Sequence, residues 1–373
     1  MKWCYVAFDV DVIKHAGVWK KIQMQSESIR KSTNKCDICI IGKEVHFFDG
    51  PNDLKEPKVL ELSSLREILA EYDVLYFRWG GSNKLFNELL EEIKSKVLVV
   101  EIPTYPVMGE MRSKAKSRWQ NKKFLKAIKG YLGGFALEYY YIRKQKRKAD
   151  MFVLTTLQHS IAGTTTVNIL NGIEPSKIAL REVKRNSEAL KLLAVANVSY
   201  WHGFDRIIRG LATYTGGKKV EFIVVGEGTE LDRLKSLTKS LQLSSQVQFR
   251  GVLVGNDLDK CFDECDVAVG SLGLHRLGAW PSTLKSREYM ARGIPFLMEK
   301  GESIENIPEA FPFIYEIPGD ETPVDIESVL QWADNMDVQK AKEILRECAV
   351  EKCSWDAQMK KVVDAVEHLK TKN

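Results

Sequence analysis

The sequence predicts an α/β protein with two doubly wound domains, because short apolar runs alternate with amphipathic stretches along the whole chain. The chain has 373 residues, 44% of them hydrophobic, which is enough to bury two ordinary cores. A turn-rich and charged stretch at 171–186 separates the two halves. We therefore expect domains over 1–180 and 181–353, and a C-terminal helix over 354–373 that packs back on the first domain.

Each half contains apolar runs of strand length with helical stretches between several of them. In the first half we expect strands at 3–8, 37–41, 74–77, 97–102, 151–154 and 167–170, and helices at 18–30, 65–72 and 84–94. In the second half we expect strands at 192–195, 222–225, 247–249, 267–269 and 296–298, and helices at 204–214, 230–241, 257–264 and 283–292. Ligands of such sheets bind at the carboxyl ends of the strands, so we expect a site in these loops, at a cleft between the domains.

The stretch Pro281–Gly293 has the features of a helix that holds a nucleoside diphosphate. Ser282 is a good N-cap, so we expect the helix to start at Thr283 and to end at the final glycine. Its first turn offers unpaired N–H groups and the positive end of the helix dipole, and Lys285 adds a full charge. Glu288 follows on nearly the same face, about 7–8 Å along the axis from Thr283, which is roughly the span from a pyrophosphate to its ribose. The alternative is an ordinary surface helix with a Lys–Glu pair.

The net charge of +5 is distributed unevenly. Residues 112–148 contain 13 Lys or Arg and one acid, Glu138, so this segment carries +12 and the rest of the chain carries 5 − 12 = −7. Aromatic residues are interleaved with the basic ones, a mixture that suits an anionic membrane surface. The segment predicts membrane contact; a helical hairpin that packs on its own domain is the alternative, and nucleic acid is a less favoured partner.

The cysteines and the lengths of the apolar runs indicate in which cellular compartment the protein is expected. Seven scattered cysteines are an odd number, which favours a reducing cytoplasm over a disulfide framework. Cys36 and Cys39 form a CxxC, but no second pair or nearby His completes a zinc site, so we expect no metal. No apolar run approaches 18 residues, and the first residues are typical of a strand. We expect a cytoplasmic protein without a bound cofactor, with peripheral contact at the inner face of the cell membrane as an option.

Two motifs in the second half point to a family. Gly226 and Gly228 form a Gly-x-Gly after the second strand, and residues 288–295 read Glu-Tyr-Met-Ala-Arg-Gly-Ile-Pro. Over roughly 187–300 the chain resembles the retaining family 4 glycosyltransferases of the bacterial polysaccharide type. These have the GT-B architecture, two Rossmann-like domains facing across a cleft. The resemblance implies metal-independent transfer of a sugar from a nucleoside-diphosphate sugar to a glycan or lipid-linked acceptor, in cell-surface polysaccharide synthesis.

The resemblance also implies roles for single residues of the second half. Glu288 would bind the donor ribose. The donor diphosphate would be met by Asn197, Ser282, Thr283, Leu284 and Lys285. The base side of the donor would be lined by Gly226, Arg250 and Val252.

Three positions depart from the family pattern. Asn197 replaces an Arg that contacts the diphosphate, His202 replaces its Lys partner, and Trp280 replaces the first Glu of the E-x7-E element. Because negative charge develops on the leaving diphosphate, we expect a protonated His202, with Arg276 and Lys285, to neutralise it. His275 and Arg276 are expected beside the donor sugar, so His202, His275 and Arg276 are the catalytic candidates. The alternatives are a neutral His202 that makes a hydrogen bond at a helix start, and a His275 on the loop surface. Trp280 is either a stacking platform or a plug of the cleft rim.

The first half offers weaker candidates for contacts with the acceptor or the sugar. These are Gly17, Arg78, Glu101 and Tyr105, each at or after the end of an expected strand. No catalytic base is assigned. The rivals are a nucleotide-sugar epimerase of the same fold and a non-catalytic subunit that binds sugar nucleotides or glycans. A nicotinamide dehydrogenase is disfavoured because no GxGxxG follows the first strand.

Overall fold

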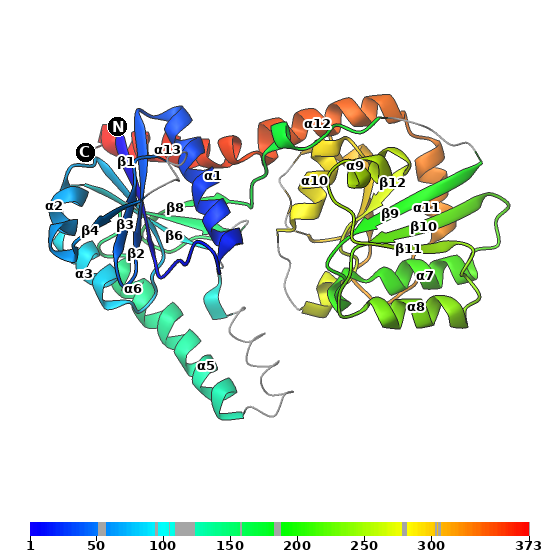
Figure 1. Ribbon diagram of the computed structural model, residues 1–373, viewed down its shortest axis with the longest axis horizontal. Helices are drawn as coiled ribbons and strands as arrows, with labels where there is room; N and C mark the ends of the chain where they lie inside the picture. Colours follow the sequence, from blue (N-terminus) through cyan, green and yellow to red (C-terminus); the bar gives the residue numbers. More distant parts are fainter. Residues whose placement is uncertain are drawn as a thin grey trace. The chain divides into compact units, whose positions relative to one another are not determined.

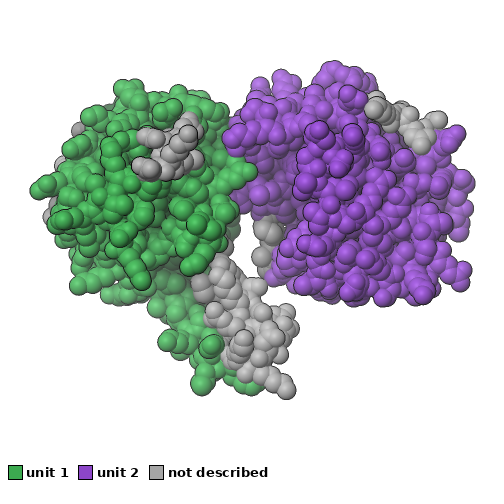
Figure 2. Space-filling view, viewed as in Figure 1, with its two compact units in different colours: residues 1–170, 355–373 green, residues 171–354 purple. Residues whose placement is uncertain are grey.

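The computed structural model describes residues 1–50, 57–93, 96–103, 105–108, 124–156, 159–182, 188–277, 282–302, 304 and 307–372. The chain forms two compact units, shown in different colours in Figure 2. Unit 1 consists of Met1–Leu170 together with Trp355–Asn373, and unit 2 consists of Asn171–Ser354. Unit 2 therefore starts at 171, where we expected 181, and the C-terminal helix belongs to unit 1.

Unit 1 contains an eight-stranded sheet in the order β4-β3-β2-β1-β5-β6-β7-β8. Its strands are β1 (Lys2–Phe8), β2 (Lys35–Ile41), β3 (Val45–Phe48), β4 (Lys58–Leu60), β5 (Val74–Arg78), β6 (Val97–Ile102), β7 (Met151–Thr155) and β8 (Thr165–Ile169). The six expected strands are all present and pair in parallel. Sequence reasoning missed β3 and β4, which pair antiparallel at one edge and are only four and three residues long.

Helices cover both faces of this sheet (Figure 1). The helices of unit 1 are α1 (Ala16–Ser32), α2 (Leu65–Ala70), α3 (Lys84–Glu92), α5 (Phe124–Ala136), α6 (Ile142–Gln145) and α13 (Trp355–Lys372), of which α5 does not cover the sheet. The C-terminal helix α13 lies beside α1 and buries Trp355, Met359 and Val362 in their shared core. A π-helical turn, Leu137–Tyr141, joins α5 to α6, and α5 projects away from the sheet.

Unit 2 contains a six-stranded, fully parallel sheet in the order β11-β10-β9-β12-β13-β14. Its strands are β9 (Ala189–Val195), β10 (Lys219–Val225), β11 (Val247–Gly251), β12 (Val267–Val269), β13 (Phe296–Glu299) and β14 (Ile314–Ile317). Its helices are α7 (Phe204–Thr213), α8 (Leu231–Ser240), α9 (Asn256–Asp263), α10 (Leu284–Arg292), α11 (Ile326–Asp334) and α12 (Val338–Cys353). The expected elements are all present, and β14, α11 and α12 are additional.

Two cores enclose this sheet, so unit 2 is doubly wound as predicted. Helices α9, α10 and α12 contribute side chains to one core, and α7, α8 and α11 contribute to the other. Figure 1 shows where these helices lie around the sheet. In a sheet of this kind the loops that follow the strands meet at one edge. The carboxyl ends of β9, β10, β12 and β13 and the start of α10 therefore define the edge where a ligand is expected.

Candidate functional site

The loops at the carboxyl edge of the unit 2 sheet interlock through backbone hydrogen bonds. The amide of Val198, after β9, donates to the carbonyl of Glu227, after β10, at 2.6 Å. The amide of Leu272, after β12, donates to the carbonyl of His202 at 2.9 Å. These bonds fix the three loops to one another, so the edge is a preformed surface.

Two glycines are required for this packing. Gly226 has φ +118°, and a Cβ there would lie 1.9 Å from the carbonyl oxygen of Ala196. Gly228 has φ +148°, and a Cβ there would lie 2.3 Å from the carbonyl oxygen of Val198. Both values are far inside van der Waals contact, and both φ angles disfavour other residues. The Gly-x-Gly motif therefore serves close contact between loops, in addition to the base-side role that we predicted for Gly226.

Helix α10 begins at this edge, one residue later than expected. Its N-cap is Thr283 with extended backbone, whereas Ser282 accepts a 3.4 Å hydrogen bond from the Asn171 amide. The Thr283 hydroxyl does not cap the helix; it donates to Oε1 of Glu302 at 2.5 Å. The N–H groups of the first turn thus have no side-chain cap within the described residues, and they suit an anion. Gly293 ends the helix at φ +67°, as predicted.

Lys285 lies in the first turn of α10 with its ammonium group buried. The Nζ atom lies 5.3 Å from the ring centroid of Phe204, the first residue of α7. It has no hydrogen-bond partner among the residues that the structure describes. Burial lowers the pKa of Lys285 to about 7, although the charges of Glu302 and Glu288 act in the opposite direction. A shielded, unpaired cation at a helix N-terminus is a site that an anion would complete.

His202 does not carry the charge that we expected of it. Its ring is 6% exposed and stacks on Phe204 at 5.3 Å, and its Nδ1 accepts a 2.9 Å hydrogen bond from the Ser199 amide. Burial and the charge of Lys285 lower the pKa of His202 to about 3. The prediction of a protonated His202 is therefore wrong, and the alternative of a neutral ring at a helix start is the one observed. The cation beside it is Lys285.

Arg276 and His275 are held in a network of carboxylates. Arg276 donates to both carboxylate oxygens of Asp205, at 3.0 and 3.2 Å, and to Glu321 at 2.8 Å. The ring nitrogens of His275 lie 3.0 Å from carboxylate oxygens of Glu299 and Glu321. These carboxylates occupy the hydrogen-bonding groups of Arg276 and both ring nitrogens of His275, so both residues secure the loop after β12. Their catalytic role stays a prediction.

Other predicted donor residues lie along the same edge. Glu288 follows Lys285 on α10, is 35% exposed, and pairs with Nε of Arg292 at 3.0 Å. Asn197 and Leu284 are exposed, and Val252 is 59% exposed after β11. Arg250 is paired with Glu264 at 3.0 Å. The structure thus brings these residues to one edge of unit 2 and leaves their roles as predictions.

Two of the four candidates in unit 1, Glu101 and Arg78, belong to one buried ion cluster. Glu101 is fully buried and acts as a hub, because it accepts hydrogen bonds from Tyr5 and Tyr76 and pairs with Lys21 at 3.2 Å and Arg78 at 3.5 Å. Although burial opposes ionisation, these two cations lower the pKa of Glu101 to about 2. Glu101 and Arg78 therefore form an internal ion cluster, and contact of Glu101 with an acceptor is contradicted.

The remaining sequence candidates are less constrained. Gly17 is the second residue of α1, and nothing lies within 4 Å of a Cβ placed on it, so the expected loop glycine is helical. Tyr105 is half-buried, and its ring meets that of His159 edge-on at 5.8 Å. Trp280 lies outside the described residues, as do positions 112–123 of the basic segment. No group of His, Cys, Asp or Glu in the described ranges could hold a metal ion.

The structure adds one residue that sequence reasoning missed. Glu302 follows β13, is 5% exposed, and accepts hydrogen bonds at Oε1 from Thr283 (2.5 Å) and Ser286 (2.6 Å) of the α10 start. Its Oε2 is buried and has no hydrogen-bond partner in the described part of the chain. The available signal was an acid three residues after a strand end at the expected ligand edge.

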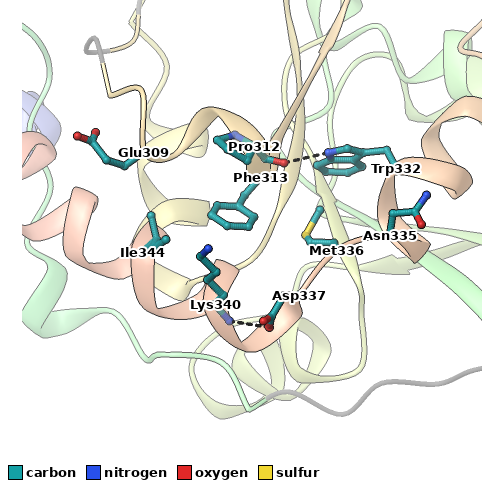
Figure 3. A pocket seen from close by; sticks show the side chains of 9 residues that line it. All are labelled: Glu309, Pro312, Phe313, Trp332, Asn335, Met336, Asp337, Lys340 and Ile344. Atoms are coloured by element: carbon teal, nitrogen blue, oxygen red, sulfur yellow. Dashed lines mark hydrogen bonds between the residues drawn. The ribbon is translucent and has the colours of Figure 1, made fainter.

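A separate pocket of about 550 Å³ lies away from this edge (Figure 3). Phe313, Trp332, Met336 and Ile344 line it, just before β14 and between the end of α11 and the start of α12. Because the β14 strand runs parallel to its neighbours, this pocket lies at the amino edge of the sheet. It is therefore not part of the donor site that we predicted.

One family model matches the part of unit 2 that contains these loops and α10. Residues 176–308 match the family model for glycosyl transferases group 1, which covers the carboxyl-edge loops and α10. The chain is a glycosyltransferase. No curated protein matches this glycosyltransferase by sequence.

Solved structures show that the glycosyltransferase has the GT-B fold. A glycosyltransferase from Rickettsia africae matches with a TM-score of 0.63 and 12% identity over 100% of both chains. Sucrose-phosphate synthase from Thermosynechococcus elongatus matches with a TM-score of 0.59 and 14% identity over 100% of both chains. HepE from Anabaena, in complex with UDP, matches with a TM-score of 0.57 and 13% identity over 99% of this chain and 100% of its own. At these identities the likeness concerns the fold.

Proposed function

We propose that this glycosyltransferase moves a sugar, with retention and without a metal ion, from a nucleoside-diphosphate sugar to a glycan or lipid-linked acceptor. The observation that carries the proposal is the buried, unpaired Nζ of Lys285 at the uncapped start of α10, as seen among the described residues. The similar Anabaena protein has been solved with UDP and with UDP-glucose, which supports a donor of this class. The acceptor and a role in cell-surface polysaccharide synthesis at the cytoplasmic side are part of the same proposal.

The proposed role of Lys285 follows from the negative charge of the departing diphosphate. As the glycosidic bond to the donor breaks, negative charge develops on the departing diphosphate. Lys285 and the N–H groups of the first α10 turn face that charge with fixed donors, and they stabilise it more in the transition state than in the bound donor. Glu288, about 4.5 Å further along the helix from Lys285 by the usual rise per residue, is placed to accept hydrogen bonds from the ribose hydroxyls.

The proposal is tested with UDP-, GDP-, ADP- and dTDP-glucose in the presence of EDTA. We expect one of these to be hydrolysed slowly to the free nucleoside diphosphate, and hydrolysis to be lost when Glu288 and Lys285 are both replaced by alanine. Nuclear magnetic resonance of the released sugar reports the anomer. An epimerised sugar nucleotide without release of diphosphate would favour the epimerase, and binding without any hydrolysis would favour the non-catalytic subunit.

We further propose that α5 and the turn that follows it contact an anionic membrane. Six large apolar residues of α5 are 40–84% exposed: Phe124, Leu125, Ile128, Tyr131, Leu132 and Phe135. Over 124–148 the chain has seven Lys or Arg and one acid, a net charge of +6. Exposed apolar rings on a basic helix suit the headgroup region of anionic lipids. Within the described residues, no helix combines the length and apolarity needed to span a bilayer.

Charge reversal tests this membrane contact. Replacing Lys126 and Lys129 with glutamate removes about 1 kcal/mol of attraction per lysine and adds repulsion of similar size, so we expect release from phosphatidylglycerol vesicles. Cosedimentation measures the bound fraction, and the same reversal of Lys235 and Lys239 on α8 is the control. Equal sedimentation of all three proteins would contradict the proposal, as would equal binding to neutral phosphatidylcholine vesicles.

A further inference from the structure

Glu302 is a buried acid whose two oxygens have different surroundings. Oε1 accepts from the hydroxyls of Thr283 and Ser286, whereas Oε2 is buried without a partner among the described residues. A buried carboxylate oxygen without a donor costs free energy that folding alone does not recover. Burial raises the pKa of Glu302, although both hydroxyls and the charges of Arg287 and Lys285 act to lower it. The free protein thus keeps a strong acceptor unsatisfied at this position.

A second unsatisfied group lies in the first turn of α10, the turn that Glu302 contacts. The Nζ of Lys285 is also buried without a hydrogen-bond partner in the described ranges, and Lys285 and Glu302 do not form an ion pair with each other. A buried cation and a buried acceptor that each lack a hydrogen-bond partner match a ligand that presents an anion beside a hydroxyl group. A sugar attached to a phosphate has this combination.

The strand order indicates which end of the donor Glu302 meets. In the sheet, β11 and β10 lie on one side of β9 and β12, and β13 lies on the other. The base-side residues that we predicted follow β10 and β11, and Lys285 with the α10 start lies between β12 and β13 in the chain. Glu302 follows β13. A donor with its base near β11 and its diphosphate at α10 therefore extends its sugar towards Glu302.

We propose that Glu302 is a specificity residue of the donor site, and that its Oε2 accepts a hydrogen bond from a hydroxyl of the sugar to be transferred. Thr283 and Ser286 hold the other oxygen and aim the carboxylate. This inference rests on the proposed function, because it requires that Lys285 and α10 hold the donor diphosphate. It predicts that the protein distinguishes a sugar nucleotide from the corresponding nucleoside diphosphate through a single acid.

The test compares the two ligands in Glu302→Gln. Glutamine keeps the size of the side chain and an oxygen for Thr283 and Ser286, but it presents an amide in place of the free carboxylate oxygen. Titration calorimetry is run with UDP, GDP, ADP and dTDP and with the glucose derivative of each. We expect the nucleoside diphosphate to bind within twofold of wild type, and its glucose derivative to bind about 10- to 100-fold more weakly, as for a hydrogen bond to a charged group.

Three controls separate the possible outcomes. Retained binding of the nucleoside diphosphate shows that Glu302→Gln is folded, and Glu309→Gln, at the amino edge, is expected to change neither affinity. Deoxy derivatives of the glucose nucleotide give a second measurement: one of them should weaken binding to wild type but not to Glu302→Gln. Equal effects on both ligands, or no effect on either, would overturn the assignment of Glu302 alone. If wild type binds none of the four nucleoside diphosphates, the proposed function and this inference fail together.

Discussion

Replacing Lys285 with methionine is expected to weaken binding of the nucleoside diphosphate by about 10- to 100-fold, the usual cost of losing a hydrogen bond to a charged group. The reason is that Nζ is buried and has no hydrogen-bond partner in the described structure, so its N–H donors are not committed to another group of the protein. Methionine keeps an unbranched apolar side chain of nearly the same length, and it removes the ammonium group that lies over Phe204. Titration calorimetry measures the change.

The same lysine sets a pH dependence. Because the pKa of Lys285 in the free protein is about 7, the ammonium form declines above that pH, and binding must then take up a proton. The dissociation constant for UDP-glucose should therefore rise about tenfold per pH unit above pH 7 and level off below it. The pyrophosphate of this ligand does not titrate in that range, so the slope reports on the protein.

A matched lysine provides the control. Lys235 on α8 also lies over a phenylalanine ring, with Nζ 6.0 Å from the Phe249 centroid, but its side chain is exposed. Lys235→Met should bind as wild type and keep the pH dependence, whereas Lys285→Met should show a flat profile. Tight and pH-dependent binding by Lys285→Met would show that the diphosphate lies elsewhere.

Replacing Gly226 with alanine is expected to destabilise unit 2 by about 3 kcal/mol or more, through backbone strain and a steric clash together. The backbone has φ +118°, and the new Cβ would lie 1.9 Å from a carbonyl oxygen in the loop after β9. Neither atom is at the end of a flexible side chain, so a loop must move. Hydrogen exchange of β9 and β10 measures the effect within unit 2.

Gly217 provides the comparison for this substitution. It lies between α7 and β10, nothing lies within 4 Å of a Cβ built there, and its φ is not positive. Gly217→Ala should leave exchange unchanged or slower, because alanine restricts the unfolded chain. If both alanine variants exchange at the wild-type rate, the close packing of the Gly226 loop is not required for stability.

Periodic features of the structure were predictable, and features that depend on distant partners were not. Every expected strand is present, because fully buried parallel strands form apolar runs that stand out locally. The glycine at the end of α10 was also predictable, since a left-handed residue after a helical pattern has few alternatives. The short edge strands β3 and β4 lack such a run, and they were missed.

In the candidate site, too, the features set by nearby residues were predictable and those set by distant residues were not. The position of Lys285 followed from helix signals within ten residues. The actual state of Arg276 depends on Asp205 and Glu321, which are 71 and 45 residues away. His202 is neutral because the fold buries it beside Lys285, and no local pattern records that burial. Glu302 was missed because its partners Thr283 and Ser286 belong to another element.

The return of the chain to unit 1 has a consequence for biosynthesis. Unit 2 is one continuous segment, Asn171–Ser354, whereas unit 1 is completed by α13, whose Trp355, Met359 and Val363 enter the core beside α1. During translation, all of unit 2 emerges from the ribosome before those residues do. Unit 2 is therefore complete on the ribosome before unit 1 is, the opposite of the usual N-to-C order of domain completion. Until Trp355–Lys372 is made, the apolar side chains of α1 and of the N-terminal sheet that pack against α13 stay uncovered, and such an apolar surface is a target for chaperones.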